Sequence, residues 1–174
     1  SQGGSLIDSV AYGFQVEDYS LARMDLTQDE WSLASPTPGE SNLMAEMGSI
    51  RTDPVFINEW MASPSAGADW FELYCGGSLP IALGGYYLTD DLNEPSKFRL
   101  APYSYLGGKS RWIQVMADDK VSADTAHVNF KLSGSGELIA LFSPLGGEVD
   151  LVEFGLQTEG VSQGRYPDGA ELIS

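Results

Sequence analysis

Short apolar runs, each bounded by glycine or proline, recur through most of the 174-residue chain. Several alternate apolar with polar positions and are rich in β-branched and aromatic residues, as strands with one buried face are. The runs are 55–60, 69–74, 86–89, 112–116, 138–142 and 149–154, and double-glycine turn signals lie between many of them. No stretch has the pattern of a long amphipathic helix. Many short strands at this spacing predict an all-β sandwich or barrel.

Alternation also assigns side chains to the two faces of a strand. In the run 55–60 one face would carry Val55, Ile57 and Glu59, and the other Phe56, Asn58 and Trp60. In the run 69–74, Phe71 and Leu73 would face away from Trp70, Glu72 and Tyr74. Trp70 and Trp112 lie in patterns typical of core positions.

A partial internal repeat is the most informative feature of the sequence. Residues 8–23 align without a gap with residues 150–165, at an offset of 142. The identical pairs are Asp8/Asp150, Val10/Val152, Gly13/Gly155, Gln15/Gln157, Glu17/Glu159, Ser20/Ser162 and Arg23/Arg165. The equivalent positions of Arg23 and Arg165 indicate a shared structural role, and we expect each to pair with an acidic side chain or with backbone carbonyls.

The repeat predicts an asymmetric organisation. Residues 1–42 would be the C-terminal tail of a preceding repeat unit, residues 43–54 a linker, and residues 55–174 a sandwich that lacks its own final segment. Such a sandwich would have a vacant edge, which is open to pairing. We expect the segment 1–42 to dock there, either in cis or in trans as a strand-swapped dimer; an independent appendage is the alternative.

The ordered set of motifs resembles the lamin-tail domain family. The matching pieces are residues 55–62, 69–74, 83–91, 129–133, 136–141, 149–152 and 162–169. The resemblance implies an immunoglobulin-like β-sandwich, in agreement with the strand pattern, and an accessory, non-catalytic module. Tandem copies without a heptad rod are similar to the bacterial members, which are exported or surface-attached, so the resemblance also implies an extracellular or cell-surface location.

Charge and composition limit the partners. The chain has 25 acidic and 9 basic residues, a net charge of -16, and its basic residues are scattered, so we expect no nucleic-acid partner. No run is long and apolar enough to predict membrane insertion. One cysteine, Cys75, and one histidine, His127, exclude an internal disulfide and the usual Cys/His zinc sites.

One acidic loop is a candidate calcium site. Asp90, Asp91, Asn93 and Glu94 follow a predicted strand, and Asp118 and Asp119 would add oxygens if the fold brought the two loops together. Calcium takes six to eight oxygen ligands, several of them carboxylates. The alternative is a solvated turn in which aspartate caps backbone amides. No other cofactor is expected.

Aromatic residues form a candidate glycan platform. The pool is Tyr86, Tyr87, Tyr103 and Tyr105, with Trp60 and Trp112. The flat face of an aromatic ring suits the C–H face of a sugar. The alternative is that these rings pack in the core.

Catalysis is not expected. Glu59 and Glu72 lie within apolar runs and form the minimal carboxylate pair of a glycoside hydrolase, but each could instead face solvent or pair with Arg99 or Arg111. His127 has no nucleophile-elbow serine to serve. The sequence therefore predicts a non-catalytic interaction or spacer module that contacts a protein partner or neighbouring domains. The alternative is a carbohydrate-binding module that uses exposed aromatic residues and acidic loops, with or without calcium.

Overall fold

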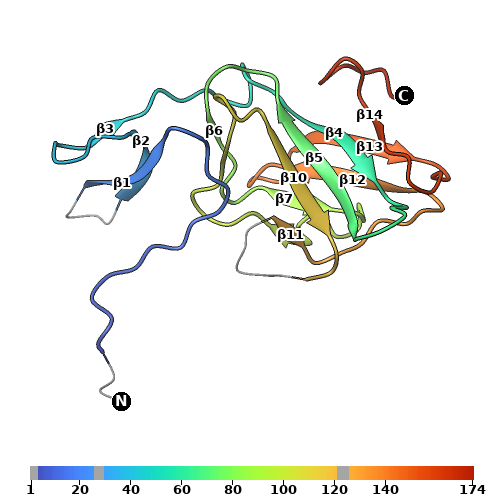
Figure 1. The fold of residues 1–174 in the computed structure, drawn as a ribbon, viewed down its shortest axis with the longest axis horizontal. Helices are drawn as coiled ribbons and strands as arrows, with labels where there is room; N and C mark the ends of the chain where they lie inside the picture. The colour runs from blue at the N-terminus through green and yellow to red at the C-terminus, as the bar shows by residue number, and fades with distance from the viewer. Residues whose placement is uncertain (1–3, 26–29, 121–125) are drawn as a thin grey trace.

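The protein is a β-sandwich in the computed structural model, which describes residues 4–25, 30–120 and 126–174 (Figure 1). One sheet has the order β11 (His127–Val128), β10 (Trp112–Ala117), β5 (Asp69–Cys75), β4 (Val55–Met61), β14 (Gln163–Gly164). The facing sheet has the order β13 (Glu148–Phe154), β12 (Glu137–Phe142), β7 (Tyr87–Thr89), β8 (Phe98–Arg99). A small ribbon pairs β6 (Ile81–Ala82) with β9 (Tyr105–Leu106). Every predicted run forms a strand, and the prediction of a β-sandwich is confirmed.

The core lies between the two sheets and is closed by aromatic rings. Trp60 stacks on Phe154 of the facing sheet with ring centroids 5.6 Å apart, and Phe71 stacks on Phe130 at 6.2 Å. Phe71 and Leu73 are fully buried, as the alternation of their strand predicts. Interleaved rings of this kind bury large apolar areas and fix the distance between the sheets.

A β-bulge in β4 overturns the face assignment of that strand. The pairing of β4 with β5 shifts register between Ile57 and Glu59, so Asn58 is the extra residue. Beyond a bulge the alternation restarts on the other face. Trp60 therefore enters the core with Val55 and Ile57, and Glu59 leaves it. The predicted grouping of Trp60 with Phe56 was wrong for this reason.

A second, smaller core lies in the N-terminal part of the chain. There β1 (Ser20–Asp25), β2 (Glu30–Ser35) and β3 (Leu43–Met44) form a three-stranded sheet to one side of the sandwich (Figure 1). β3 falls in the stretch 43–54 that the sequence predicts as a linker. Buried Val16, Leu33 and Ala45 pack against Tyr105 of the sandwich. Residues 1–3 and 26–29 of the predicted tail lie outside the described residues.

Candidate functional site

The N-terminal segment contacts the sandwich along residues 102–105. The Gly13 N–H donates to the Pro102 carbonyl at 2.9 Å, and the Tyr105 N–H donates to the Phe14 carbonyl at 2.8 Å. The Phe14 side chain is 3% exposed and belongs to the main core. In this structure the segment therefore lies on the sandwich of its own chain, held by strand-like bonds and one buried ring.

Polar contacts secure the same junction at its edges. The Gln15 side-chain amide donates to the Tyr103 carbonyl at 2.8 Å, and Lys109 forms an ion pair with Asp18. Ser104 is buried, and its hydroxyl accepts a bond from the Phe14 N–H at 3.3 Å. Because the buried donors and acceptors are matched, the contact loses little to desolvation.

A second polar centre forms around Arg165 at the other end of the sandwich. Its guanidinium makes a two-oxygen contact with Asp150 at 2.9 and 3.1 Å and also donates to the Ile57 and Ala170 carbonyls. The Ile57 N–H donates to Asp150 at 2.6 Å. Burial raises the pKa of Asp150. The Ile57 N–H and the Arg165 guanidinium favour the ionised carboxylate and so partly offset this rise. Arg165 thus connects β13, β4 and the C-terminal loop.

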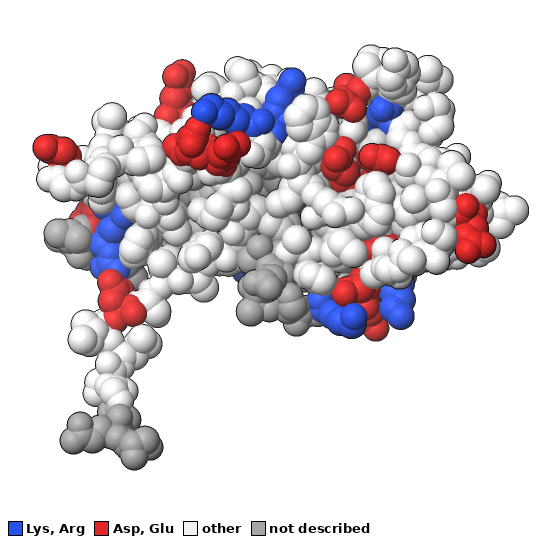
Figure 2. All heavy atoms as spheres, in the orientation of Figure 1, with Lys and Arg blue, Asp and Glu red and all other residues white. Residues whose placement is uncertain are grey.

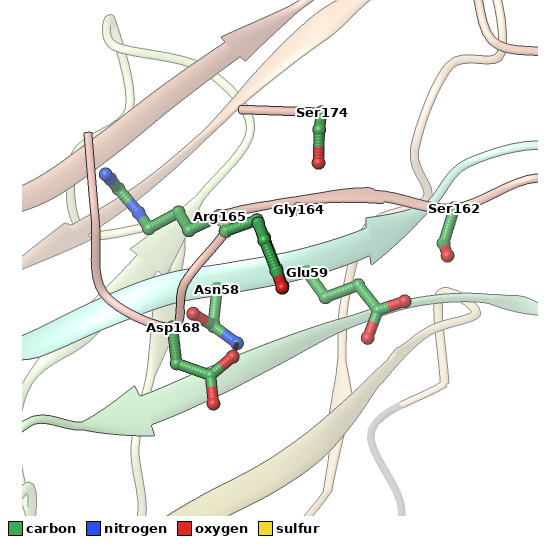
Figure 3. Close-up of a pocket in the computed structure, with 8 residues that line it drawn as sticks. Asn58, Glu59, Ser162, Gly164, Arg165, Asp168 and Ser174 are labelled. Carbon is green, nitrogen blue, oxygen red and sulfur yellow. Dashed lines mark hydrogen bonds between the residues drawn. The ribbon is translucent and has the colours of Figure 1, made fainter. Parts of the chain in front are cut away.

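Asn58, the bulge residue, organises the neighbouring carboxylates. Its side-chain amide donates to Glu72 at 2.9 Å and to Asp168 at 3.1 Å, and its oxygen accepts from the Gly169 N–H. Figure 3 shows Asn58 and Asp168 side by side, with the Arg165 guanidinium pointing away from Glu59. These residues line a cavity of about 270 Å³. The cavity wall is polar, and three of its side chains, Asn58, Arg165 and Asp168, are hydrogen-bonded within the protein.

The predicted carboxylate pair is brought together in this region. Glu59 and Glu72 are cross-strand partners in β4 and β5. Burial raises the pKa of Glu72, and the negative charges of Glu59 and Asp168 raise it further. The hydrogen bond from Asn58 acts in the opposite direction and lowers it. Glu72 is bonded to Asn58 in place of the arginine partners that the sequence suggested; Arg111 instead donates to the Cys75 and Gly76 carbonyls.

The residues of the predicted calcium loop bond largely to one another and to a lysine. Asp90 pairs with Lys97 at 2.5 Å, and Asp91 accepts from the backbone and side-chain amides of Asn93. These Asn93 bonds lower the pKa of Asp91, and Glu94 is exposed. Among the described residues no group of three or more His, Cys, Asp or Glu side chains is arranged to hold a metal ion. Calcium binding stays a prediction.

The second acidic pair lies beside the histidine. Asp118 Oδ1 lies 3.0 Å from His127 Nδ1. Although burial acts to raise it, the pKa of Asp118 is lowered by this contact and by Lys120. Asp119 has a φ of 58° and is exposed. His127 thus anchors a loop end through Asp118.

The structure separates the aromatic residues predicted for a glycan platform. Tyr86 and Tyr87 are half-buried near β7, and Tyr86 packs against the main core. Tyr105 is only 5% exposed, and half-buried Tyr103 packs against the same small N-terminal core. Trp60 is fully buried. Tyr103 and Tyr105 therefore belong to the junction with the N-terminal segment.

A different aromatic row, of which the sequence analysis named only Trp112 as a glycan candidate, crosses the outer face of the first sheet. Trp112, Tyr74 and Phe56 are cross-strand neighbours, with centroid distances of 5.3 and 6.4 Å. Arg111 lies over Tyr74 at 4.8 Å, and Arg165 lies over Phe56 at 5.4 Å. The expectation of a core position for Trp112 was wrong, since the residue is 44% exposed. Its strand presents Ile113 and Val115, not Trp112, to the core side.

The expected roles of the two equivalent arginines are confirmed. Arg23 pairs with Asp8 at 2.9 Å, as Arg165 pairs with Asp150. The sequence signal was available, because Asp8 and Asp150 are identical positions of the same repeat. Asn58 and Asp168 were missed because neither lies in the repeat and the bulge is not visible in the alternation.

Comparison with known families fits this architecture. The family model described as Lamin Tail Domain matches residues 49–155, more than half of the chain. The chain belongs to the lamin tail domain family. No match was found among curated proteins. The lamin tail domain is an immunoglobulin-like fold and is generally a non-catalytic interaction module, so the predicted fold class is confirmed.

The match defines which parts of the chain form the lamin tail domain itself. It begins within the predicted linker 43–54 and stops at Gly155. The docked N-terminal segment and the stretch 156–174, which includes β14 and Arg165, lie outside it. Segments beyond the matched core therefore supply one partner in the contacts at residues 102–105 and one partner, Arg165, in the centre around Asp150.

The charge of this lamin tail domain is spread over its surface. Figure 2 shows acidic side chains over several elements, with many of the basic side chains on this face close to acidic ones. The described salt bridges agree, since Lys97, Lys109 and Lys120 each pair with an aspartate. Within the described part of the chain, no helix has the length and apolar character needed to cross a membrane.

Proposed function

We propose that this lamin tail domain is an interaction and spacer module of a larger bacterial protein that is exported or attached to the cell surface. Its task would be to hold neighbouring parts of the parent chain at a fixed separation and to present contact surfaces to a protein partner. The observation that carries the proposal is the docking of the N-terminal segment, whose Phe14 enters the core of the sandwich.

A spacer must transmit position from one end to the other. The junction has the features of a rigid contact, because Phe14 is buried and the backbone groups of Gly13 and Phe14 bond to those of Pro102 and Tyr105. The small core formed with Tyr105 adds a second area of apolar contact. A linker without such contacts would leave the N-terminal sheet free to rotate.

Distance measurements between spin labels test the proposal. Glu40→Cys and Leu145→Cys place labels at exposed positions in the loop between β2 and β3 and in the loop between β12 and β13 of the sandwich, while native Cys75 is buried. We expect one narrow distance distribution. Phe14→Asp should broaden it, since a carboxylate cannot occupy the apolar site. A broad distribution in the chain with native Phe14 would contradict a spacer role.

Carbohydrate binding is the second candidate, and the row Trp112–Tyr74–Phe56 favours it. Only Trp112 in this row offers a large exposed ring; Tyr74 is 7% exposed beneath Arg111. The test is a glycan array probed with calcium and again with a chelator. Saturable binding that Trp112→Ala abolishes would establish a glycan site at this row. A signal that the chelator removes would assign calcium to the loop Asp90–Glu94, and no signal in either condition would exclude this candidate.

A further inference from the structure

The two copies of the internal repeat have the same local structure. Both contain an Asp–Arg pair, Asp8–Arg23 and Asp150–Arg165. In both, the glutamine two residues after the shared glycine donates to that glycine's carbonyl, at 3.2 Å and 2.9 Å. The next turn has a positive φ at equivalent positions, 66° at Asp18 and 71° at Gly160.

The equivalence extends through the hairpin that follows. Arg23 pairs with Trp31 in the β1–β2 ladder, and Arg165 forms an antiparallel bridge with Ile173. Trp31 and Ile173 are again 142 positions apart, so each arginine pairs with the residue eight positions further along the chain. Each copy therefore forms the same turn, ion pair and arginine pairing.

The surroundings of the two copies differ. Phe14 is 3% exposed on the face formed by residues 102–105, whereas its equivalent, Leu156, is 82% exposed. Val16 is buried in the small core, whereas its equivalent, Thr158, is exposed. Val161, the equivalent of half-buried Tyr19, is 53% exposed. The second copy thus presents to solvent the three apolar docking positions of the first copy, whereas Gln157, the equivalent of Gln15, is buried and donates to Gln163.

The shared glycine at the start of the segment points to the same contact. A Cβ on Gly13 would lie 1.8 Å from the Ser104 hydroxyl oxygen, so close approach to the docking face requires glycine there. At Gly155 a Cβ would meet nothing within 4 Å and φ is not positive, so nothing within this chain requires glycine. Docking of residues 155–158 against a face like 102–105 would supply the reason.

We infer that residues 155–174 form a docking surface for another lamin tail unit, whose face equivalent to residues 102–105 they cover. The inference rests on the proposed spacer function, which it extends to a head-to-tail series of units with a period of 142 residues. A second intact copy is not the occupant, because its own residues 13–16 already cover that face. The occupant is a unit that follows in the same chain.

The register of the repeat dictates the test. Because Ser32 and Ser174 are equivalent, residues 33–174 can be joined directly after Ser174 so that the hairpin continues. In this tandem protein we expect the amide of Leu156 to exchange hydrogen at least about tenfold more slowly than in the 174-residue chain, because it gains the bond that Phe14 makes to Ser104. Mass spectrometry of the peptide around residue 156 measures the change.

Matched variants identify the contact. Leu156→Asp should restore fast exchange in the tandem protein and leave the stability of the 174-residue chain unchanged, because the residue is exposed there. Leu145→Asp, at a 98% exposed apolar position outside the repeat, should change neither. Equal exchange rates of the Leu156 amide in the tandem protein and in the single chain would overturn the inference. That result would not affect the label-distance test of the proposed spacer function.

A second measurement does not depend on folding of the added unit. Phe14→Asp uncovers the face 102–105 of an otherwise complete chain. Because this variant keeps its own Leu156 and could dock on itself, it also carries Leu156→Asp. We expect the double variant to form a complex with the native chain in analytical ultracentrifugation, and Leu156→Asp in the native partner to abolish the complex. A double variant whose sedimentation is the same with and without the native chain would count against docking by residues 155–174.

Discussion

Arg165 shows how one side chain can bind three segments that are distant in sequence. Its guanidinium satisfies the Ile57 and Ala170 carbonyls as well as both oxygens of Asp150. The planar fork of arginine suits such a site, and lysine, with one ammonium group, cannot match it. Arg23 repeats the ion pair in a more open setting. Its partner Asp8 is 63% exposed, whereas Asp150, the partner of Arg165, is 13% exposed.

Removal of the two arginines should therefore have unequal effects. Arg165→Ala is expected to lower the free energy of unfolding by about 3 kcal/mol, because it leaves Asp150 buried without its partner. Arg23→Ala, the matched control, should lower it by no more than about 1 kcal/mol, as for an exposed pair. Urea unfolding followed by tryptophan fluorescence measures both. Equal losses would show that burial does not determine the strength of this pair.

Glu72 should make the sandwich less stable as the pH rises. Its pKa in the folded chain is raised above 4.5, chiefly by burial. The folded state therefore binds the proton more tightly than the unfolded state, and this contribution to stability is complete below pH 4.5 and is lost as the pH rises through the folded-state pKa.

Glu72→Gln tests that dependence, because glutamine keeps the acceptor for Asn58 without the charge. At about pH 7 the variant should unfold with a free energy roughly 0.5 kcal/mol higher than the native chain, a value reduced for solvent screening of a half-buried group. At about pH 4 the two chains should be equal. Urea titrations at both pH values decide the point; a native chain that is the more stable at neutral pH would refute it.

At the scale of elements, hydrophobic alternation predicted the longer strands of the main sandwich, but not its irregularities or the two-residue strands β8, β11 and β14. The bulge at Asn58 depends on contacts with Asp168 and Gly169, which are more than 100 residues away, so no local pattern reveals it. Exposure of Trp112 has a similar cause, because the ring packs at a tilt against Tyr74 outside the core. The Asp–Arg pairs were predictable, since repeat identity reports shared contacts even where the surroundings differ.

The turn shared by both copies offers a test at this scale. Gly160 has a φ of 71°, and a Cβ there would have room, with Ser65 at 3.7 Å. Gly160→Ala should therefore lower the free energy of unfolding by about 1 kcal/mol through backbone strain alone. Gly160→Asp, which installs the residue of the equivalent Asp18, should cost less, since aspartate tolerates this conformation. Thermal unfolding of both variants compares them, and a larger loss for aspartate would indicate that the two turns are not equivalent.

For the whole molecule, two cores share one boundary. Phe14 belongs to the large core and Tyr105 to the small one, although each comes from the opposite part of the chain. Because each part of the chain contributes a side chain to the core of the other, the N-terminal sheet is coupled to the sandwich. A family match alone would not reveal it, because residues 4–25 lie outside the matched range.

The net charge of -16 acts on this assembly as a whole. Carboxylates spread over the surface repel one another more in the compact chain than in the expanded one, and salt screens that repulsion. The midpoint of thermal unfolding should therefore rise by about 3 °C between low salt and about 0.5 M sodium chloride. The ion pairs oppose this trend only weakly, because the exposed pairs contribute little and the Arg165–Asp150 pair is buried away from the salt ions.

Replacement of exposed Glu148, Glu153 and Glu159 by glutamine should raise the unfolding midpoint at low salt and reduce its increase with added salt. A midpoint that falls as salt is added would mean that attraction between paired charges, and not repulsion among carboxylates, dominates the electrostatics of the fold.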